Sequence, residues 1–449
     1  MSRPGRASCR NSIPLRRVIL IQAVVLLALT GSWSLMPRDQ KLAVAATALR
    51  QPYPLTVNLR SSTATVITSL HADERVISDA DLQQALRMLI PRFSRSQLRP
   101  NLIEHALRTW GSTIDFGDPD AISGPEMAAF LTDSARHLES WNNKVDPMID
   151  DAPQGVYVPF GGARSNSVHH DHALAALTES GLALDYPVIT PRRTTSVRYI
   201  LDEALRDFRL DGVEPEWSVL SFGLWMAQDG ITEWHNGSGR RISFDSLVNR
   251  LVREAMQRGV CLGTHRVYTL AALLRLHHMH DQTLLRPATA EVAARYLHEV
   301  QRRIEQSQNE DGSWSVNWMQ LPEGPEIPTD DSPLNRSIIA TGHHLEWMAI
   351  SPEEFHVPRE QIIKAGEWLT QQLLASSPED VELNYTYYSH VVRALALWRG
   401  SSPAEFYTQH AQQAPDPLEP EESSLEESSL NDAEQAPEPN PQPIDASVL

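Results

Sequence analysis

Apolar segments of helical length recur at a nearly regular interval, and this rhythm constrains the fold more than any other feature of the sequence. Five such segments begin near positions 168, 217, 263, 341 and 389. The intervals are roughly 48 residues, except for a longer one that contains the Pro-rich segment 319–335. Repeats of this length are typical of stacked helix pairs. We therefore expect an all-α fold in which inner and outer helices alternate.

The two kinds of helix differ in composition. The predicted inner helices are mostly apolar and span 168–180, 217–228, 263–276, 341–350 and 389–398. The predicted outer helices are amphipathic and span 195–208, 244–258, 289–306 and 359–374. Because the two kinds alternate, we expect the stack to close into an α/α toroid of about six helical hairpins over residues 76–408. The inner helices would then be parallel, with their N-termini at one mouth.

A short turn, Gln308-Asn-Glu-Asp-Gly-Ser-Trp314, ends the predicted helix 289–306. Gly312 can supply the positive φ of a helix end, and Asp311 is a good turn former. We expect the Gln308 amide to brace the helix end by hydrogen bonding and the Trp314 indole by packing. The motif resembles the QW repeat of squalene and hopene cyclases, in the terpenoid cyclase and protein prenyltransferase superfamily, whose fold is an α/α toroid. There the motif is structural, so the resemblance implies the fold and no catalytic residue.

The segment Gly342-His-His-Leu-Glu-Trp347 carries a candidate acid and base. His343 and Glu346 are three residues apart and share one helical face. The segment resembles the His-x-x-Glu-Trp element of N-acylglucosamine 2-epimerase-like sugar isomerases, another α/α barrel group. There the histidine takes part in proton transfer at a sugar, and the resemblance implies this role for His343. The alternative is a buried His and Glu pair that braces the inner wall.

Other polar side chains lie near the starts of the predicted inner helices, where parallel helices would bring them to one mouth. Helix N-termini also present unpaired N–H groups and partial positive charge, which suit an anionic ligand. The candidate ligand-binding residues are His169, His172, His265, Arg266, Tyr268, Trp347 and His390. The alternative is that these groups cap helices and line a polar cavity.

Metal and thiol chemistry are the weaker interpretations. In His169-His-Asp-His172 the first and last histidines share a helical face while the middle one points elsewhere, and no HExxH or CxxC sequence follows. Cys261 lies four residues before His265, but a glycine between them marks a helix start. A buried structural thiol is therefore preferred to a nucleophile. We predict no metal site and no cofactor.

The N-terminal region combines a basic stretch, 1–17, with an apolar stretch, 18–36, that is either a transmembrane anchor or a signal segment. No small-x-small cleavage site follows closely, so we expect an uncleaved anchor. With the arginines held in the cytoplasm, the main domain of this single-pass protein would be extracytoplasmic, that is periplasmic or extracellular. Residues 37–75, with Pro52 and Pro54, are expected to be a linker.

The negative charge is concentrated toward the C-terminus. The formal net charge is -18, and residues 409–449 are rich in Pro, Glu and Ser and contain no Lys or Arg. Such a segment cannot bury enough apolar surface to fold, so we expect a disordered acidic tail. The rest of the chain is acidic as well, which argues against nucleic acid as a partner.

Two classes of function fit these features. The first is a membrane-anchored binding or scaffolding module of the cell envelope, with structural histidines and a carbohydrate or other envelope partner. The second is a toroid enzyme, of isomerase, lyase or hydrolase type, acting on a carbohydrate or other polar ligand. Terpene cyclisation is less favoured because the chain lacks DxDD and DDxxD sequences. Convergence of His265, His343, Glu346 and His390 on an open cavity would favour the enzyme, and a filled funnel the module.

Overall fold

The computed structural model describes residues 15–49, 53–55, 57–253, 260–318 and 332–411, which are mostly helical. The expected helical fold class is thus confirmed. Within these ranges, three short antiparallel hairpins accompany the helices, and the sequence did not predict them. They pair Asp150–Asp151 (β1) with Val156–Tyr157 (β2), Pro187–Ile189 (β3) with Thr194–Ser196 (β4), and Glu233–His235 (β5) with Arg241–Ser243 (β6).

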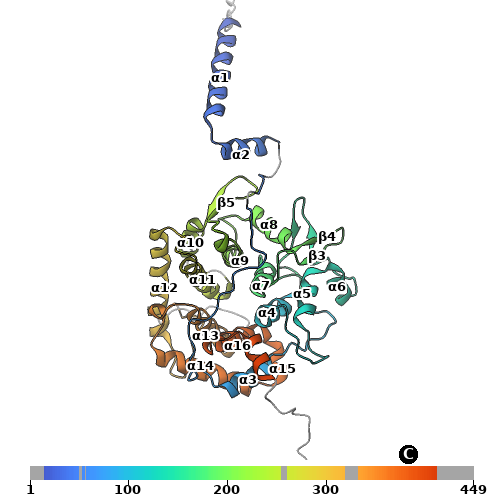
Figure 1. Ribbon diagram of the computed structural model, residues 1–449, viewed down its shortest axis with the longest axis vertical. Helices are drawn as coiled ribbons and strands as arrows, with labels where there is room; N and C mark the ends of the chain where they lie inside the picture. The colour runs from blue at the N-terminus through green and yellow to red at the C-terminus, as the bar shows by residue number, and fades with distance from the viewer. Residues whose placement is uncertain (1–14, 50–52, 56, 254–259, 319–331, 412–449) are drawn as a thin grey trace, which may run out of the picture.

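Six of the described helices follow one another around a common centre (Figure 1). They are α4 (Pro100–Trp110), α7 (His172–Glu179), α9 (Glu216–Met226), α11 (Thr264–Met279), α13 (Pro333–Ala349) and α16 (Tyr385–Trp398). Each contacts the next in chain order, and α16 contacts α4, so the order closes. Every residue of α9 is buried, as expected for a helix that is apolar on all sides. We call these six the inner helices.

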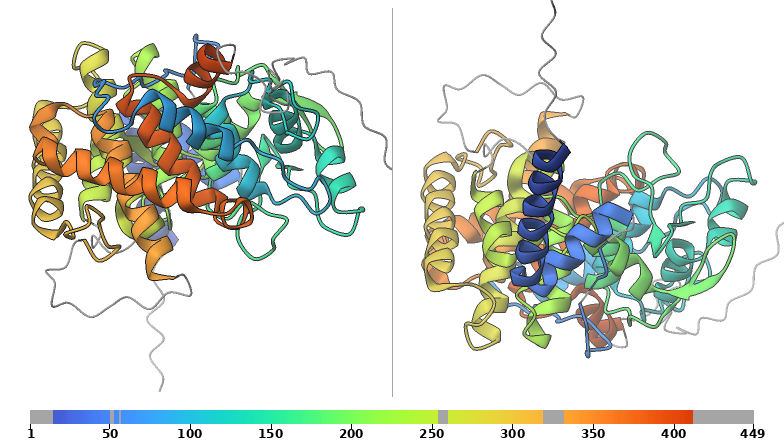
Figure 2. Two further views of the ribbon diagram at one scale, coloured as in Figure 1. Left: turned by 90° about the horizontal axis from the view of Figure 1, so that it is seen from below. Right: turned by 90° about the horizontal axis from the view of Figure 1, so that it is seen from above.

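Further helices lie outside the inner helices (Figures 1 and 2). They are α3 (Asp79–Met88), α5 (Gly124–Thr132), α6 (Ser134–Ser140), α8 (Val197–Asp207), α10 (Phe244–Arg253), α12 (Pro287–Ser307), α14 (Arg359–Ala375), α15 (Pro378–Leu383) and α17 (Pro403–Ala411). Short 3-10 turns occupy Ala227–Asp229, Val260–Gly263 and Glu353–Phe355. In α10 the buried residues are Phe244, Leu247, Val248 and Leu251, the stripe that an amphipathic helix turns toward a core.

The starts of three inner helices, α7, α13 and α16, differ from the prediction by four residues or more; α16 begins at Tyr385 rather than near 389. α13 begins at Pro333 rather than near 341, because the Ser332 hydroxyl accepts a hydrogen bond from the N–H of Asn335 (3.1 Å) and Pro333 occupies the first position. His343 therefore lies well inside α13 and not in its first turn. α7 begins at His172 rather than 168. The predicted anion-binding helix N-terminus thus does not apply to His343.

α1 (Leu15–Leu35) stands apart from the body, and most of its apolar side chains are exposed (Figure 1). Its segment Arg16–Leu35 is long and apolar enough to cross a membrane, a property that signal sequences share. α2 (Arg38–Leu49) follows. Later parts of the expected linker pack on the body: Tyr53 is buried, and the N–H of Leu70 donates to the carbonyl of Ala349 (3.0 Å). Residues 412–449 of the expected tail lie outside the described residues.

Two side chains of the turn after α12, Gln308 and Trp314, connect the turn to α14 and to the end of α12. The Gln308 amide Nε2 donates to the carbonyl of Gly312 (2.9 Å) and to that of Gln361 in α14 (2.8 Å). The buried Trp314 indole donates to the carbonyl of Ile304 in the last turns of α12 (2.7 Å). Trp314 thus braces the end of α12 as expected, although through a hydrogen bond, whereas the Gln308 amide bonds within the turn and fixes α14 against it.

Substituting Gly312 by alanine is expected to lower the free energy of unfolding by about 2–4 kcal/mol. Gly312 has φ +98°, and a Cβ there would lie 2.6 Å from the backbone oxygen of Lys364. Urea denaturation of the full chain in detergent micelles measures the loss. Gly161→Ala is the matched control, because Gly161 has φ +67° but nothing within 4 Å of its Cβ position. Equal losses at both positions would contradict a role for close packing on α14.

Candidate functional site

Four inner helices carry a histidine followed three residues later by a polar side chain. The pairs are His105 and Arg108 on α4, His265 and Tyr268 on α11, His343 and Glu346 on α13, and His390 and Arg393 on α16. Residues three apart share a helical face, one turn apart. The four helices therefore present two layers of polar groups to the centre of the body.

The first layer is a closed circuit of aromatic rings, one from each inner helix, which we call the histidine layer. The ring centres are 4.8 Å apart for His105 and His172, 4.5 Å for His172 and Trp217, 4.2 Å for Trp217 and His265, 4.4 Å for His265 and His343, 4.0 Å for His343 and His390, and 5.3 Å for His390 and His105. None of the six residues is more than 8% exposed.

The second layer, which we call the charged layer, consists of Arg108, Glu179, Tyr268, Glu346 and Arg393. Arg108 lies between the two glutamates, with Nε 2.5 Å from Oε2 of Glu179 and Nη2 2.9 Å from Oε1 of Glu346. Arg393 pairs with the same two carboxylates, at 2.8 Å to Glu179. The Tyr268 hydroxyl donates to Glu179 (2.9 Å) and accepts from Arg393 (2.9 Å). Two positive and two negative charges therefore balance one another.

The charges of this layer are fixed by their mutual contacts. Burial alone would raise the pKa of Glu346, but Arg108 and Arg393 outweigh it and hold that pKa well below its usual range. The pKa of Glu179 is lowered for the same reason. Burial disfavours both arginine cations, yet attraction to the acidic partners raises the pKa of each. All four groups are therefore ionised at neutral pH.

The predicted acid and base lie close together, with Nδ1 of His343 3.5 Å from Oε2 of Glu346. His390 approaches the same oxygen through Nδ1 at 3.0 Å. Burial lowers the pKa of His343, and burial together with the neighbouring His343 lowers that of His390. A catalytic acid or base works best with a pKa near the operating pH. The pKa values of His343 and Glu346, the predicted acid and base, are both lowered and thus lie away from neutral pH.

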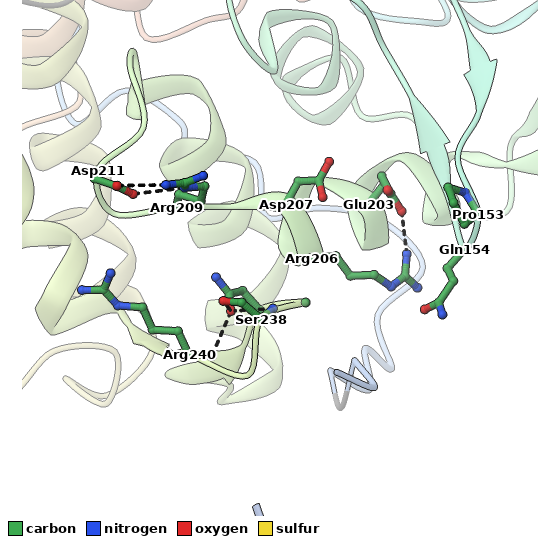
Figure 3. A pocket seen from close by; sticks show the side chains of 11 residues that line it. Pro153, Gln154, Glu203, Arg206, Asp207, Arg209, Asp211, Ser238 and Arg240 are labelled. Atoms are coloured by element: carbon green, nitrogen blue, oxygen red, sulfur yellow. Dashed lines mark hydrogen bonds and ion pairs between the residues drawn. The ribbon is translucent and has the colours of Figure 1, made fainter. Parts of the chain in front are cut away.

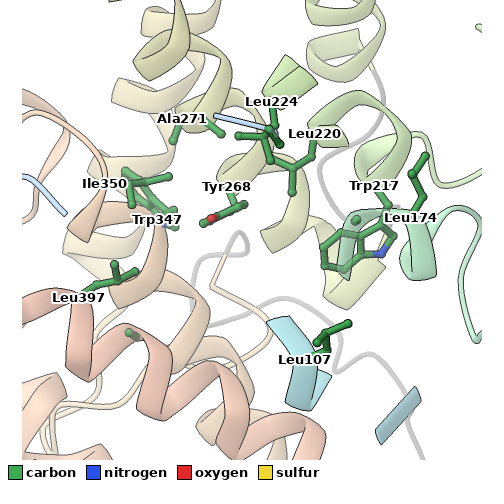
Figure 4. Packing of buried hydrophobic residues seen from close by; sticks show 14 of the residues in the cluster. Leu107, Leu174, Trp217, Leu220, Leu224, Tyr268, Ala271, Trp347, Ile350 and Leu397 are labelled. Atoms are coloured by element: carbon green, nitrogen blue, oxygen red, sulfur yellow. The ribbon is translucent and has the colours of Figure 1, made fainter. Parts of the chain in front are cut away.

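Three other predicted contact residues lie outside the two layers. His169 pairs with Glu214 (3.0 Å) at the edge of the body. Arg266 is buried but pairs with Glu216 (3.5 Å). The Trp347 indole donates to Nδ1 of its neighbour His344 (3.3 Å) and packs among apolar side chains, as Figure 4 shows. Of the predicted set, His172, His265, Tyr268, His343, Glu346 and His390 are brought together.

Several residues of the two layers were missed by the sequence analysis. They are His105, Arg108, Glu179 and Arg393. A search for a histidine followed three positions later by a polar residue would have found His105 and Arg108 on α4 and Arg393 on α16. Glu179 ends α7, where no such pattern marks it.

An accessible groove lies elsewhere, between α8 and the loop after β5 (Figure 3). Its volume is ≈ 680 Å³, and it is lined by Pro153, Gln154, Glu203, Arg206, Asp207, Arg209, Asp211, Asn236, Gly237, Ser238 and Arg240. Glu203 pairs with Arg206 (2.9 Å), and Arg209 with Asp211 (3.0 Å). The N–H of Tyr53, in the segment after α2, donates to the carbonyl of Gly237 (2.7 Å). The groove thus lies on the side of the body from which α1 projects (Figure 1).

Comparison with models of protein families, with curated proteins and with solved structures gave no match for this chain.

Proposed function

We propose that the chain is a membrane-anchored, extracytoplasmic binding or scaffolding module whose body is an α/α toroid. The closed order of contacts among the inner helices supports the toroid, as do the outer helices that surround them. The resemblance of the turn at Gln308 to the QW repeat agrees with this fold. The apolar, exposed α1 supports the anchor, and Arg16 and Arg17 at its start favour a body outside the cytoplasm.

The burial of the polar interior carries the proposal for a non-catalytic role. The side chains of His343 and Glu346 are 3% and 1% exposed. Their polar neighbours Arg108, Glu179 and Arg393 pair with one another across the centre of the body. A substrate would have to enter this packed network and separate buried ion pairs. The funnel is filled, which favours the module over the enzyme.

We place the binding surface at the groove near α8, because it is concave and accessible and most of the residues that line it are charged or polar. Arg206, Arg209 and Arg240 lie there beside Glu203 and Asp211 (Figure 3). Charged and amide groups on a concave surface suit a hydroxyl-rich or acidic ligand, such as a carbohydrate of the cell envelope. Its position on the side of the anchor would hold the partner close to the membrane.

Binding of oligosaccharides to the full chain in detergent micelles tests this proposal. We expect an upward shift in melting temperature with neutral or uronic-acid oligosaccharides, because a ligand that binds the native state stabilises it. Arg209→Ala is expected to weaken binding roughly tenfold, the equivalent of about 1.4 kcal/mol. Arg302→Ala is the matched control, since Arg302 is also exposed and paired with a nearby acid, Glu299.

The same samples distinguish the enzyme alternative. Chemical conversion of an added sugar that His343→Ala abolishes would support the toroid enzyme and contradict the module. The absence of any shift across the oligosaccharide panel, from a chain that melts cooperatively, would remove carbohydrate as the partner.

A further inference from the structure

Five buried nitrogen atoms of the histidine layer have no hydrogen-bond partner among the described residues. They are Nδ1 and Nε2 of His172, Nε1 of Trp217, Nε2 of His343 and Nε2 of His390, in residues no more than 3% exposed. A buried polar atom left unpaired costs about 1–3 kcal/mol. Native proteins rarely carry this cost without a water or an ion to offset it. The Nε2 atoms of His343 and His390 lie on adjoining rings, with ring centres 4.0 Å apart, and therefore point to a shared ligand.

Glu346 determines which ring nitrogens are left for that ligand. Its Oε2 is 3.0 Å from Nδ1 of His390 and 3.5 Å from Nδ1 of His343. A carboxylate can only accept, so Nδ1 of His390 carries the proton and donates it. Arg108 Nη1 also lies 3.2 Å from Nδ1 of His390. Because this nitrogen carries a proton, it cannot accept a hydrogen bond from Arg108. Nε2 thus carries the lone pair, and a carboxylate behind a histidine is typical of metal sites.

The surrounding geometry suits a metal ion with nitrogen and sulfur ligands. The ring centres of His265, His343 and His390 form a triangle with edges of 4.0, 4.4 and 5.3 Å. Imidazoles bonded to one Zn²⁺ at about 2.0–2.1 Å have ring centres about 5 Å apart. Two groups of possible ligand atoms share His343. In one, His343, His265 and the Cys261 sulfur lie within 4.8 Å of one another, and in the other, His343, Glu346 and His390 do. Cys261 lies in the 3-10 turn Val260–Gly263 that leads into α11.

We propose that His265, His343 and His390 bind one Zn²⁺ ion, with the thiolate of Cys261 as the fourth ligand. Glu346 is a positioning residue, because Oε1 already pairs with Arg108 and Oε2 faces the two histidines. Three imidazoles and a thiolate are a ligand set that zinc prefers. Because the histidines are buried and four protein ligands complete the coordination, the ion is structural. This site reverses the sequence prediction of no metal and is independent of the proposed binding groove.

Buried charge also agrees with an added cation. A Zn²⁺ ion with one thiolate has a net charge of +1, and the charged layer is already neutral. Glu104 supplies a further buried carboxylate, whose Oε2 lies 2.7 Å from Nδ1 of His172 without hydrogen-bond geometry. His172 belongs to the same histidine layer. Glu104 can therefore balance the zinc centre across that layer.

Metal content and cobalt spectroscopy of the full chain in detergent micelles test the site. After chelation and reconstitution with zinc, we expect one zinc per chain by mass spectrometry, and less than about a fifth of that in His343→Gln and His390→Gln. His344→Gln is the matched control, because His344 is equally buried on α13 and its Nε2 is also unpaired, but its ring packs against Trp314 and Trp318 (4.8 Å). It is expected to retain the zinc. Chelation of the wild type is expected to lower its melting temperature.

Cobalt in place of zinc gives a readout that does not depend on the folding of the histidine variants. We expect the spectrum of a tetrahedral ion with a thiolate-to-cobalt charge-transfer band, which Cys261→Ser removes. An unchanged spectrum in Cys261→Ser overturns the thiolate assignment. A wild-type chain that holds no zinc after reconstitution overturns the site, as does full zinc retention in His343→Gln.

Discussion

Replacing Glu346 by leucine is expected to lower the free energy of unfolding by about 3–5 kcal/mol, because it leaves a buried positive charge uncompensated. Arg108 and Arg393 both contact Glu346 and would then share Glu179 alone. The Glu346 side chain is 1% exposed, so water cannot replace the lost partner. Urea denaturation of the full chain in detergent micelles, with a chelator present to remove any metal contribution, measures the loss.

Two further variants make this result specific. In Glu346→Leu combined with Arg393→Leu, Arg108 and Glu179 remain as a neutral pair, so most of the lost stability is expected to return. Glu367→Leu removes an exposed carboxylate on α14 and is expected to change stability by no more than about 0.5 kcal/mol. A double variant as unstable as the sum of the two single variants would contradict a coupled charged layer.

The outer helices were the most predictable part of the fold. α10 and α12 place apolar residues at helical spacing on one face, and the same residues are buried. The inner helices are apolar on nearly all sides. Their apolar residues therefore predict that a helix is present, but they do not mark the residues at which it begins and ends. α13 starts at Pro333 because a serine cap and a proline act there, a local signal that a search for apolar residues overlooks. The hairpins were missed because their strands are only two or three residues long.

The candidate site was predicted only where spacing within a helix suffices. His343 and Glu346 share a face, so their meeting followed from the helix alone. Arg266 and Trp347 are each one position from a residue of the layers, and one position turns a side chain by about 100°. They therefore point to other neighbours. Arg108 and Arg393 were missed because charged residues on helices are usually solvated, and only the closed order of the inner helices buries them.

Mild acid is expected to unfold the body, because burial lowers the pKa of several of its histidines and keeps them neutral in the folded state. Burial is the main cause that lowers the pKa of His105, His265 and His390 well below 6.5. It lowers the pKa of His344 to about 3 and that of His356 to about 4. In the unfolded chain each histidine titrates near its ordinary pKa of about 6.5. The unfolded state thus binds more protons than the folded state whenever the pH lies between the folded-state pKa and the unfolded-state pKa of these histidines.

The direction and size of the effect follow from this difference in bound protons. Stability contributed by a group that is neutral in the folded state is fully present above about pH 7 and falls as the pH drops below 6.5. Each such histidine contributes about 1.4 kcal/mol per pH unit, so His105, His265 and His390 together give a slope on the order of 4 kcal/mol per pH unit. Glu179 and Glu346, whose pKa values are also lowered, extend the loss below about pH 4.5.

Urea denaturation at pH values from 7.5 to 5.0, with a chelator present, measures the slope and hence the protons taken up on unfolding. We expect uptake of about three or more protons per chain below pH 6. His344→Leu is expected to reduce the uptake by about one, because it removes one buried group whose pKa is lowered to about 3. A stability that stays constant from pH 7 to pH 5 would mean that the folded protein accepts these protons. The inner helices would then have to admit water to the histidine layer, and a substrate could enter by the same route, which would reopen the enzyme alternative.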